Sequence, residues 1–326
     1  MVTATPVRSN GPEASDEYPK RRWVFSGLAV FACITALAGL ILGLYPSTAA
    51  WFSAREQGKL VDLYDSKIEN AAPLSADQLI ELAHRYNDRL TAGAALDPWA
   101  NVPRGAGQQN GDGMAYKDQL RVDGTDVMAR LRIPAIEVDL PIYHGTSDET
   151  LKKGAGHLEG TSLPVGGPRT HSVITAHRGL ADATMFTNLN KVGVGDRFTI
   201  EVMGEVLTYE VRETRVVSPE DTKFLQAQDD RELVTLVTCT PLGVNTHRIL
   251  VTAERVTPTP QSDIDAARQA AQVGFPWWAV IFAVGFSIIA LFFWRSGYMI
   301  PAKKNKKDEH AVEVEADVPG HGGGGQ

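Results

Sequence analysis

The sequence predicts a mainly β domain that lies between two membrane-spanning helices. Two long uncharged apolar segments lie near the two ends of the chain, and residues 125–256 contain many short runs in which apolar and polar residues alternate. Turn-forming residues separate these runs. The 326-residue chain has a formal net charge of -7 and no long basic stripe in its middle, so no nucleic-acid partner is expected.

The two apolar segments indicate a location in the cell membrane. Residues 23–45 and 275–294 contain no charged side chain, and each is long enough to cross about 30 Å of hydrocarbon as a helix. Lys20, Arg21 and Arg22 precede the first segment, and a lysine-rich stretch at residues 295–307 follows the second. The positive-inside rule then predicts that both termini are cytoplasmic and that the middle of the chain is extracellular.

Each segment has an alternative interpretation. The first is also compatible with a cleaved signal peptide, since residues 47–50 form a passable cleavage site. An uncleaved anchor is favoured because the apolar stretch exceeds the roughly 7–15 residues of a signal core. The second is compatible with a buried core helix, which the following lysine cluster disfavours.

The composition divides the rest of the chain into segments. The tails at both ends are polar, and a Gly-, Pro-, Asn- and Asp-rich loop separates a helical region from the β region. The predicted order is a disordered cytoplasmic tail (1–22), a transmembrane helix (23–45), N-terminal helices (46–95), a loop (96–124), a β domain (125–256), a linker (257–274), a transmembrane helix (275–294) and a cytoplasmic tail (295–326).

Short strands are predicted throughout the β domain. Alternation is clear at residues 129–133, 135–140, 198–202 and 206–211. Further strand-like runs lie at residues 171–176, 233–238 and 248–252. Many short strands at this spacing favour a closed barrel or a sandwich.

Cys239 is the candidate nucleophile. The only other cysteine, Cys33, lies in the first apolar segment, and two cysteines are too few for a disulfide framework or a cysteine zinc site. Cys239 follows an apolar run, so it is expected at the end of a strand. A buried structural thiol is the alternative, but a lone thiol in an extracellular domain is exposed to oxidation, so its presence suggests use.

His177 and Arg248 are predicted to lie at the same end of neighbouring strands. An imidazole beside a thiol can exchange a proton with it, and a guanidinium can stabilise an oxyanion. Each residue alone is a weak signal, because a histidine is often structural and an arginine is often a surface charge. Five other histidines are candidates by composition: His84, His144, His157, His171 and His247.

The motifs around these residues resemble those of the sortases. Residues 235–241 (TLVTCTP) followed by residues 245–251 (NTHRILV) resemble the TLxTC...R signature of that family, and residues 175–179 (TAHRG) resemble its histidine strand. Residues 156–164 also resemble the family, and the similarity covers roughly residues 23–300. Asp97, Pro98 and Trp99 resemble the lid motif of class C sortases, the pilin polymerases, and two flanking membrane spans fit that class.

The resemblance implies an eight-stranded sortase β-barrel with N-terminal helices and a lid loop. It implies that Cys239 attacks the Thr–Gly bond of an LPXTG-like sorting signal on a pilin or surface protein, with His177 as acid and base and Arg248 stabilising the oxyanion. A pilin lysine would then resolve the thioacyl enzyme as an isopeptide bond, without a cofactor. In the lid, Asp97 would pair with Arg248 and Trp99 would cover the Cys239 sulfur.

Three alternatives remain at this stage. The chain is also compatible with a sortase that attaches surface proteins to peptidoglycan, which the Asp97-Pro98-Trp99 motif disfavours. It is compatible with an inert membrane-tethered β-domain in which Cys239 is structural. The lid motif itself is compatible with an ordinary surface turn, because Asp-Pro often starts turns.

Overall fold

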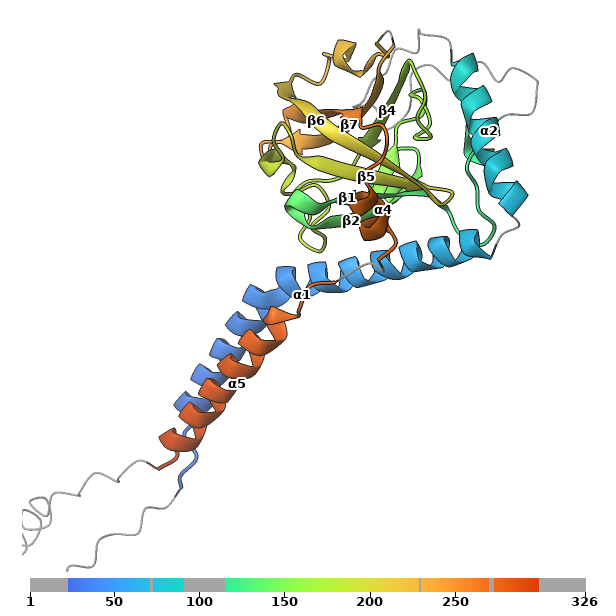
Figure 1. Ribbon diagram of the computed structural model, residues 1–326. Coiled ribbons are helices and arrows are strands. Elements are labelled where there is room, and N and C mark those ends of the chain that lie inside the picture. The colour runs from blue at the N-terminus through green and yellow to red at the C-terminus, as the bar shows by residue number, and fades with distance from the viewer. Residues whose placement is uncertain (1–22, 71–72, 91–114, 229, 270–272, 299–326) are drawn as a thin grey trace, which may run out of the picture. The chain divides into compact units, whose positions relative to one another are not determined.

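The computed structural model describes residues 23–70, 73–90, 115–228, 230–269 and 273–298 (Figure 1). The chain divides into two compact units, which are described separately. One unit contains the ends of the chain up to Leu42 and from Ile281, and the other is Gly43–Val280.

The larger unit contains a closed eight-stranded barrel. The strands are β1 (Val127–Ile133), β2 (Val138–His144), β3 (Ala155–His157), β4 (Thr170–Thr175), β5 (Arg197–Val202), β6 (Glu205–Val217), β7 (Glu232–Thr240) and β8 (His247–Arg255). Their order around the barrel is β1-β2-β3-β4-β7-β8-β6-β5. The pairs β2–β3 and β4–β7 are parallel, and the other pairs are antiparallel. The predicted mainly β fold is therefore confirmed, and the barrel rather than the sandwich is correct.

Five α-helices and four 3-10 turns accompany the strands. The helices are α1 (Gly27–Glu69), α2 (Pro73–Arg89), α3 (Asp148–Lys153), α4 (Gln261–Ala267) and α5 (Trp277–Ser296) among the residues that the structure describes. The 3-10 turns are η1 (Tyr116–Asp118), η2 (Pro134–Ile136), η3 (Leu189–Lys191) and η4 (Lys223–Leu225).

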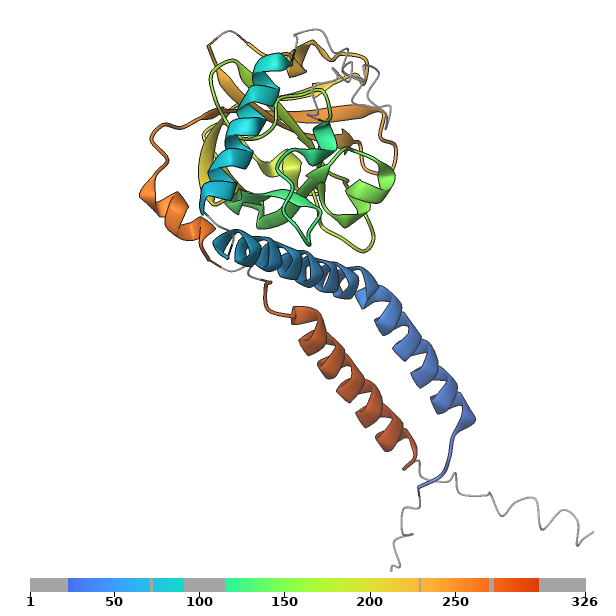
Figure 2. The ribbon, with the colours of Figure 1, turned by 90° about the vertical axis from the view of Figure 1, so that its right-hand side faces the viewer.

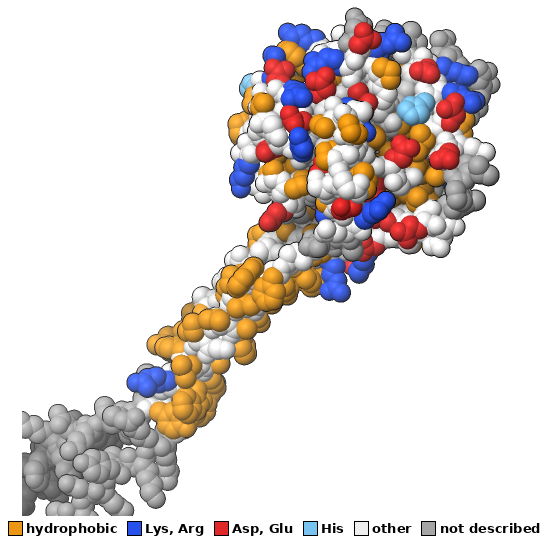
Figure 3. Space-filling model, viewed as in Figure 1, with side chains coloured by type: hydrophobic (Ala, Val, Ile, Leu, Met, Phe, Trp, Pro, Cys, Tyr) orange, Lys and Arg blue, Asp and Glu red, His pale blue; other side chains and the backbone are white. Residues whose placement is uncertain are grey.

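The smaller unit contains the beginning of α1 and most of α5, which lie side by side (Figures 1 and 2). The Trp23 and Phe293 rings meet edge to face at 5.8 Å, and Gly285 leaves room for Leu40, whose side chain would clash with a Cβ there. Figure 3 shows hydrophobic side chains along these helices. Both helices are long and apolar enough to cross a membrane, and none of the apolar window of α5 is buried, unlike a core helix of a soluble protein.

Two sequence expectations about element boundaries were wrong. Instead of ending near residue 45, α1 continues through Pro46 to Glu69. The run at residues 135–140 is not a continuous strand, because η2 turns the chain and Glu137 takes a left-handed conformation (φ 53°) before β2 begins at Val138. Pro134 favours this turn because its ring fixes φ, and its carbonyl accepts the Glu137 N–H at 3.2 Å.

Helix α2 covers part of the barrel (Figure 2). Ile80 and Ala83 are buried in the main hydrophobic core together with side chains from the strands, whereas Leu82 of the same helix is 39% exposed. Asn87 holds the end of α2 to the barrel through two reciprocal hydrogen bonds with the backbone of Leu163, at 2.7 and 3.1 Å.

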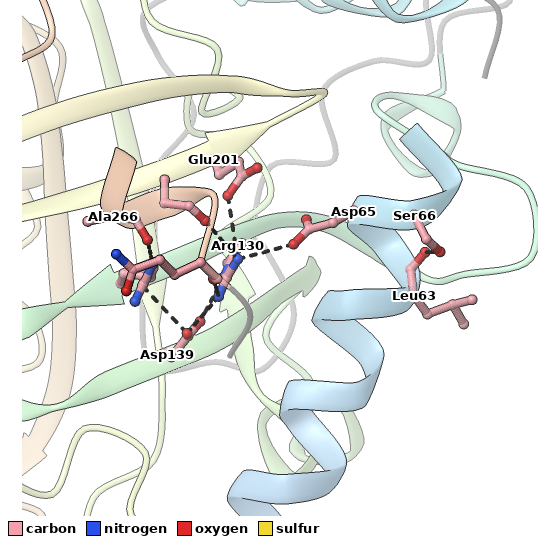
Figure 4. Close-up of polar contacts among 10 residues, drawn as sticks. Leu63, Asp65, Ser66, Arg130, Asp139, Glu201 and Ala266 are labelled. Carbon is pink, nitrogen blue, oxygen red and sulfur yellow. Dashed lines mark hydrogen bonds and ion pairs between the residues drawn. The ribbon is translucent and has the colours of Figure 1, made fainter. Parts of the chain in front are cut away.

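A buried arginine connects the barrel to the segments on either side of it (Figure 4). Arg130 of β1 is 1% exposed and makes ion pairs with Asp139 of β2 at 2.8 Å, Asp65 of α1 at 3.1 Å and Glu201 of β5 at 3.7 Å. It also donates to the carbonyl oxygens of Ala267, at the end of α4, and Gln269. One guanidinium therefore joins three strands to the helix that precedes the barrel and the helix that follows it.

The same cluster determines how its carboxyl groups titrate. Burial raises the pKa of Asp65 to about 6 and that of Glu201 to about 7, while the Arg130 charge acts in the opposite direction. A carboxyl whose pKa is raised by folding stabilises the fold below its unfolded pKa, and this stabilisation is lost as the pH rises through the folded pKa. Both groups therefore depend on Arg130 most strongly above pH 7.

We predict that Arg130→Met lowers the free energy of unfolding by about 3–5 kcal/mol at pH 8, because it leaves buried carboxylates without their cation. The deficit should shrink as the pH is lowered toward 5, where Asp65 and Glu201 bind protons. Arg197→Met, which breaks an exposed pair with Glu210, is the matched control and should lose only about 0–1 kcal/mol. Urea unfolding of the full chain in detergent measures both, and equal losses at pH 8 would contradict the assignment.

Candidate active site

Strand β7 lies between β4 and β8, and this position organises the site. It is parallel to β4, with Thr175 opposite Val237, and antiparallel to β8, with Cys239 opposite Arg248. The ends of β4 and β7 and the start of β8 therefore meet at one rim of the barrel. The expected common rim for the three candidate residues is thus present in the structure.

A buried chain of hydrogen bonds sets the register of these three strands. His171 of β4 shares a hydrogen bond of 2.7 Å with the Thr235 hydroxyl of β7, and Thr235 shares one of 2.9 Å with the Thr252 hydroxyl of β8. His171 is 2% exposed and Thr235 is fully buried, and the second ring nitrogen of His171 is bonded to the Gln226 carbonyl at 2.9 Å. Slipping either neighbour of β7 by one residue would break this chain and leave buried polar groups without partners.

Cys239 and Arg248 face each other across the β7–β8 pair. Directly opposed residues of an antiparallel pair extend to the same face of the sheet, at about 4.5–5.5 Å between Cβ atoms. Both side chains are partly buried. Arg248 Nη1 donates to the carbonyl oxygens of Asn245 at 2.6 Å and His247 at 2.9 Å, so the loop between the strands holds the guanidinium at this rim.

His177 lies two residues beyond the end of β4. Continuing the β4–β7 register by two residues brings it level with Cys239. The chain stays attached to β7 up to this point, because Ala176 donates its N–H to Val237 and accepts the Thr238 hydroxyl at 2.8 Å. On the other side, the His177 carbonyl accepts the N–H of Phe186, whose side chain is fully buried.

Charged groups from other elements act on these residues. Burial lowers the pKa of His177; Asp148 of α3 acts against this shift, and Lys152 reinforces it. Burial also lowers the pKa of Arg248, while electrostatic interactions with Cys239 and Glu220 act against the shift. The site therefore combines a histidine whose pKa is lowered by burial with a thiol and a cation, which suits proton exchange and anion stabilisation.

The other candidate histidines are held elsewhere. His157 is fully buried against the Tyr116 hydroxyl and the Ser162 carbonyl, and burial lowers its pKa to about 4. His144 is bonded to the Gln119 carbonyl at 2.8 Å. His247 is exposed and opposite Thr240, so it extends to the other face of the sheet from Arg248. His84 lies on α2 near Gly167.

Some charged neighbours were missed by the sequence interpretation. Asp148 and Lys152 lie on α3, where Ser147 caps the helix by accepting the Thr150 N–H. The Ser147-Asp148-Glu149 run is a recognisable helix start, but nothing in the sequence places this helix near the end of β4. The proximity of Glu220 to Arg248 depends on the pairing of Val217 with Arg248, which is equally a tertiary feature.

The cavity in the described surface that is lined in part by η1, β2 and α3 does not coincide with this rim. It has a volume of about 350 Å³, and its lining includes Lys117, Arg121, Tyr143 and Lys153. Cys239, His177 and Arg248 are not among its lining residues, so the chemistry of the rim, rather than the cavity, identifies the candidate site. Among the described residues no group of three His, Cys, Asp or Glu side chains is arranged to hold a metal ion.

The lid motif Asp97-Pro98-Trp99 lies outside the described residues. Its pairing with Arg248 and its cover over Cys239 stay predictions from the sequence.

Known proteins are similar to this chain in sequence and fold. A family model described as Sortase domain matches residues 131–256. Sortase D of Bacillus subtilis is 31% identical over 130 residues, which are 39% of this chain. The match covers 63% of that protein, less than two thirds of its length.

Solved structures match at higher identity. Sortase C-1 from Actinomyces oris is 51% identical, with a TM-score of 0.51 over 56% of this chain and 98% of that one. Sortase C of Streptococcus pneumoniae, whose structure bears on catalysis and pilin substrate specificity, is 36% identical, with a TM-score of 0.56 over 62% of this chain and 98% of that one. With the closed barrel and the motifs around residues 177, 239 and 248, these similarities show that the chain belongs to the sortase family.

Proposed function

We propose that this chain is a class C sortase, a cysteine transpeptidase that cleaves an LPXTG-like sorting signal between Thr and Gly and joins pilin subunits through a lysine isopeptide bond. The observation that carries the proposal is the register of β4, β7 and β8, which supports a common site for His177, Cys239 and Arg248. The similarity to sortase C-1 of Actinomyces oris favours the pilin-polymerising class.

The proposed reaction has two acyl-transfer steps. His177 takes the Cys239 proton, and the thiolate attacks the threonine carbonyl carbon to form a tetrahedral oxyanion beside Arg248. The C–N bond then breaks, the glycine amine leaves with the proton from His177, and a thioacyl enzyme remains. The lysine amine attacks the thioester, His177 accepts its proton, and the thiolate leaves as the isopeptide bond forms.

Mass spectrometry of the products tests the acceptor. Full-length protein in detergent would be incubated with an LPXTG-type peptide and equal amounts of a pilin lysine peptide and a peptidoglycan-stem amine. We expect the acyl fragment on the lysine side chain with release of the glycine-containing fragment. Transfer to the peptidoglycan amine alone would support the anchoring sortase instead. Absence of both cleavage and transfer would support a non-enzymatic β-domain.

We predict that Arg248→Lys loses most of the activity although the charge remains. A lysine offers one flexible point charge, whereas the guanidinium is a planar fork already held by the Asn245 and His247 carbonyls. Losing one oxyanion donor typically costs about 10²–10³ in rate.

The value of kcat/KM for peptide cleavage measures this effect. Arg212→Lys, on the exposed face of β6, is the control and should match wild type. Near-full activity of Arg248→Lys would show that Arg248 contributes charge alone.

The proposed location is the cell membrane, with two spans, an extracellular catalytic domain and both termini in the cytoplasm. The two candidate spans and the basic residues beside them support this arrangement. We predict that a reporter fused after Lys307 is read in the cytoplasm and that one inserted near Gln108 is read outside. An extracellular C-terminus would rule out the two-span arrangement.

A further inference from the structure

The turn that carries His177 is fastened to β7 by the next residue along the chain. The Arg178 guanidinium uses all three of its nitrogens. Nη1 donates to the Thr240 hydroxyl at 2.8 Å, Nε to the Thr187 carbonyl at 3.2 Å, and Nη2 to the Asn190 side-chain oxygen at 3.1 Å. Two of these acceptors belong to the loop that follows His177, and the third is the residue directly after Cys239.

These bonds form a short bridge across the candidate site. His177 and Arg178 are neighbours in the chain, as are Cys239 and Thr240, so the Arg178–Thr240 bond joins the two reacting residues through one intervening residue on each side. A fork with fixed geometry suits this task better than a single flexible donor. The bridge therefore restrains the separation between the imidazole and the thiol at a point where β4 has ended and its backbone hydrogen bonds to β7 no longer do so.

A second contact reinforces the same connection. Gly179 has φ +78°, and a Cβ at this position would clash with the Leu242 side chain, so Leu242 of the β7–β8 loop packs directly against the glycine. The Gly179 N–H donates to the Thr187 hydroxyl at 3.0 Å, within the same loop as the Arg178 contacts. The turn after His177 is thus held to both residues that flank Pro241.

We propose that Arg178 is a positioning residue that sets the distance between His177 and Cys239 by bonding the Thr240 hydroxyl. This inference rests on the proposed cysteine transpeptidase function and extends it. Arg178 contacts no reacting atom in this scheme. It acts through Thr240 on one side and through its peptide bond to His177 on the other.

The variants separate this bridge from general stability. Thr240→Val removes the hydroxyl and keeps the side-chain shape, whereas Thr240→Ser keeps the hydroxyl. Arg178→Lys keeps the charge and loses the fork. Asn190→Ala is the matched control, because it removes a partner of the same guanidinium that does not reach β7.

Steady-state cleavage of the sorting-signal peptide by the full chain in detergent gives the first readout. We expect Thr240→Val and Arg178→Lys to lower kcat on the order of 10²-fold, as for a small misplacement of catalytic groups, with KM nearly unchanged. Thr240→Ser and Asn190→Ala should stay near wild type. The double variant Arg178→Lys/Thr240→Val should lose no more activity than the worse of its two single variants, because both single variants remove the same Arg178–Thr240 hydrogen bond.

Alkylation of Cys239 by iodoacetamide against pH, with the site located by peptide mapping, gives a readout that needs no substrate. In wild type the rate should show a step from His177 ionisation in addition to the thiol ionisation. Thr240→Val should lose the histidine step and Thr240→Ser should keep it.

If Thr240→Val has the kcat and the alkylation profile of the wild type, Arg178 has no positioning role. The same follows if Thr240→Ser and Thr240→Val lower kcat equally. Failure of the wild-type protein to cleave the peptide would instead overturn the proposed function, and the alkylation profiles would still decide on the bridge.

Discussion

The structure depends on the register of β7 against its two neighbours. Side chains alternate between the faces of a strand, so a slip of one residue along β8 would turn Arg248 away from Cys239. The buried His171–Thr235–Thr252 chain prevents this slip, because its three polar groups are satisfied together only in the observed pairing. A histidine that the sequence left as a catalytic alternative thus holds the strands on which the catalytic candidates lie.

Around this centre the barrel is held by a second buried polar group. Arg130 draws carboxylates from α1, β2 and β5 to one point and binds carbonyls at the end of α4. Such a cluster contributes less to stability than its ion pairs suggest, because burying charges is costly. Its specific effect is on position, since the guanidinium bonds groups of α1 and of the end of α4 at the same point of the barrel. The segments that enter and leave the barrel are therefore tied to its wall.

The sequence was most informative where one strand or one motif sufficed. Alternation located β1, β5 and β6, and further strand-like runs located β4, β7 and the first part of β8. The motifs pointed to Cys239, His177 and Arg248 before their pairing was known. The short β3 was missed, because three residues carry too little periodicity to be recognised. The parallel β4–β7 pair could not be predicted, because it joins residues some 60 positions apart and no short turn connects the two strands. The groups that act on His177 from α3 follow from the same tertiary contacts.

The site thus combines local chemistry with long-range register. The motif around Cys239 supplies the thiol, but the imidazole and the guanidinium reach it only through two strand pairings of opposite direction. The hydrogen bond between Arg178, which lies beyond the end of β4, and Thr240, the last residue of β7, extends this alignment to the turn where regular pairing of β4 and β7 stops.

The proposed mechanism requires Cys239, in this alignment, to act as a nucleophile toward a sorting-signal carbonyl. Intact-protein mass spectrometry of the full chain, quenched in acid soon after mixing with an LPXTG-type peptide and no amine acceptor, tests it most directly. We expect a mass increase equal to the acyl fragment, mapped to Cys239, present in Cys33→Ala and lost in Cys239→Ala. An adduct that persists in Cys239→Ala, or its absence from wild-type protein that cleaves the peptide, would overturn this mechanism.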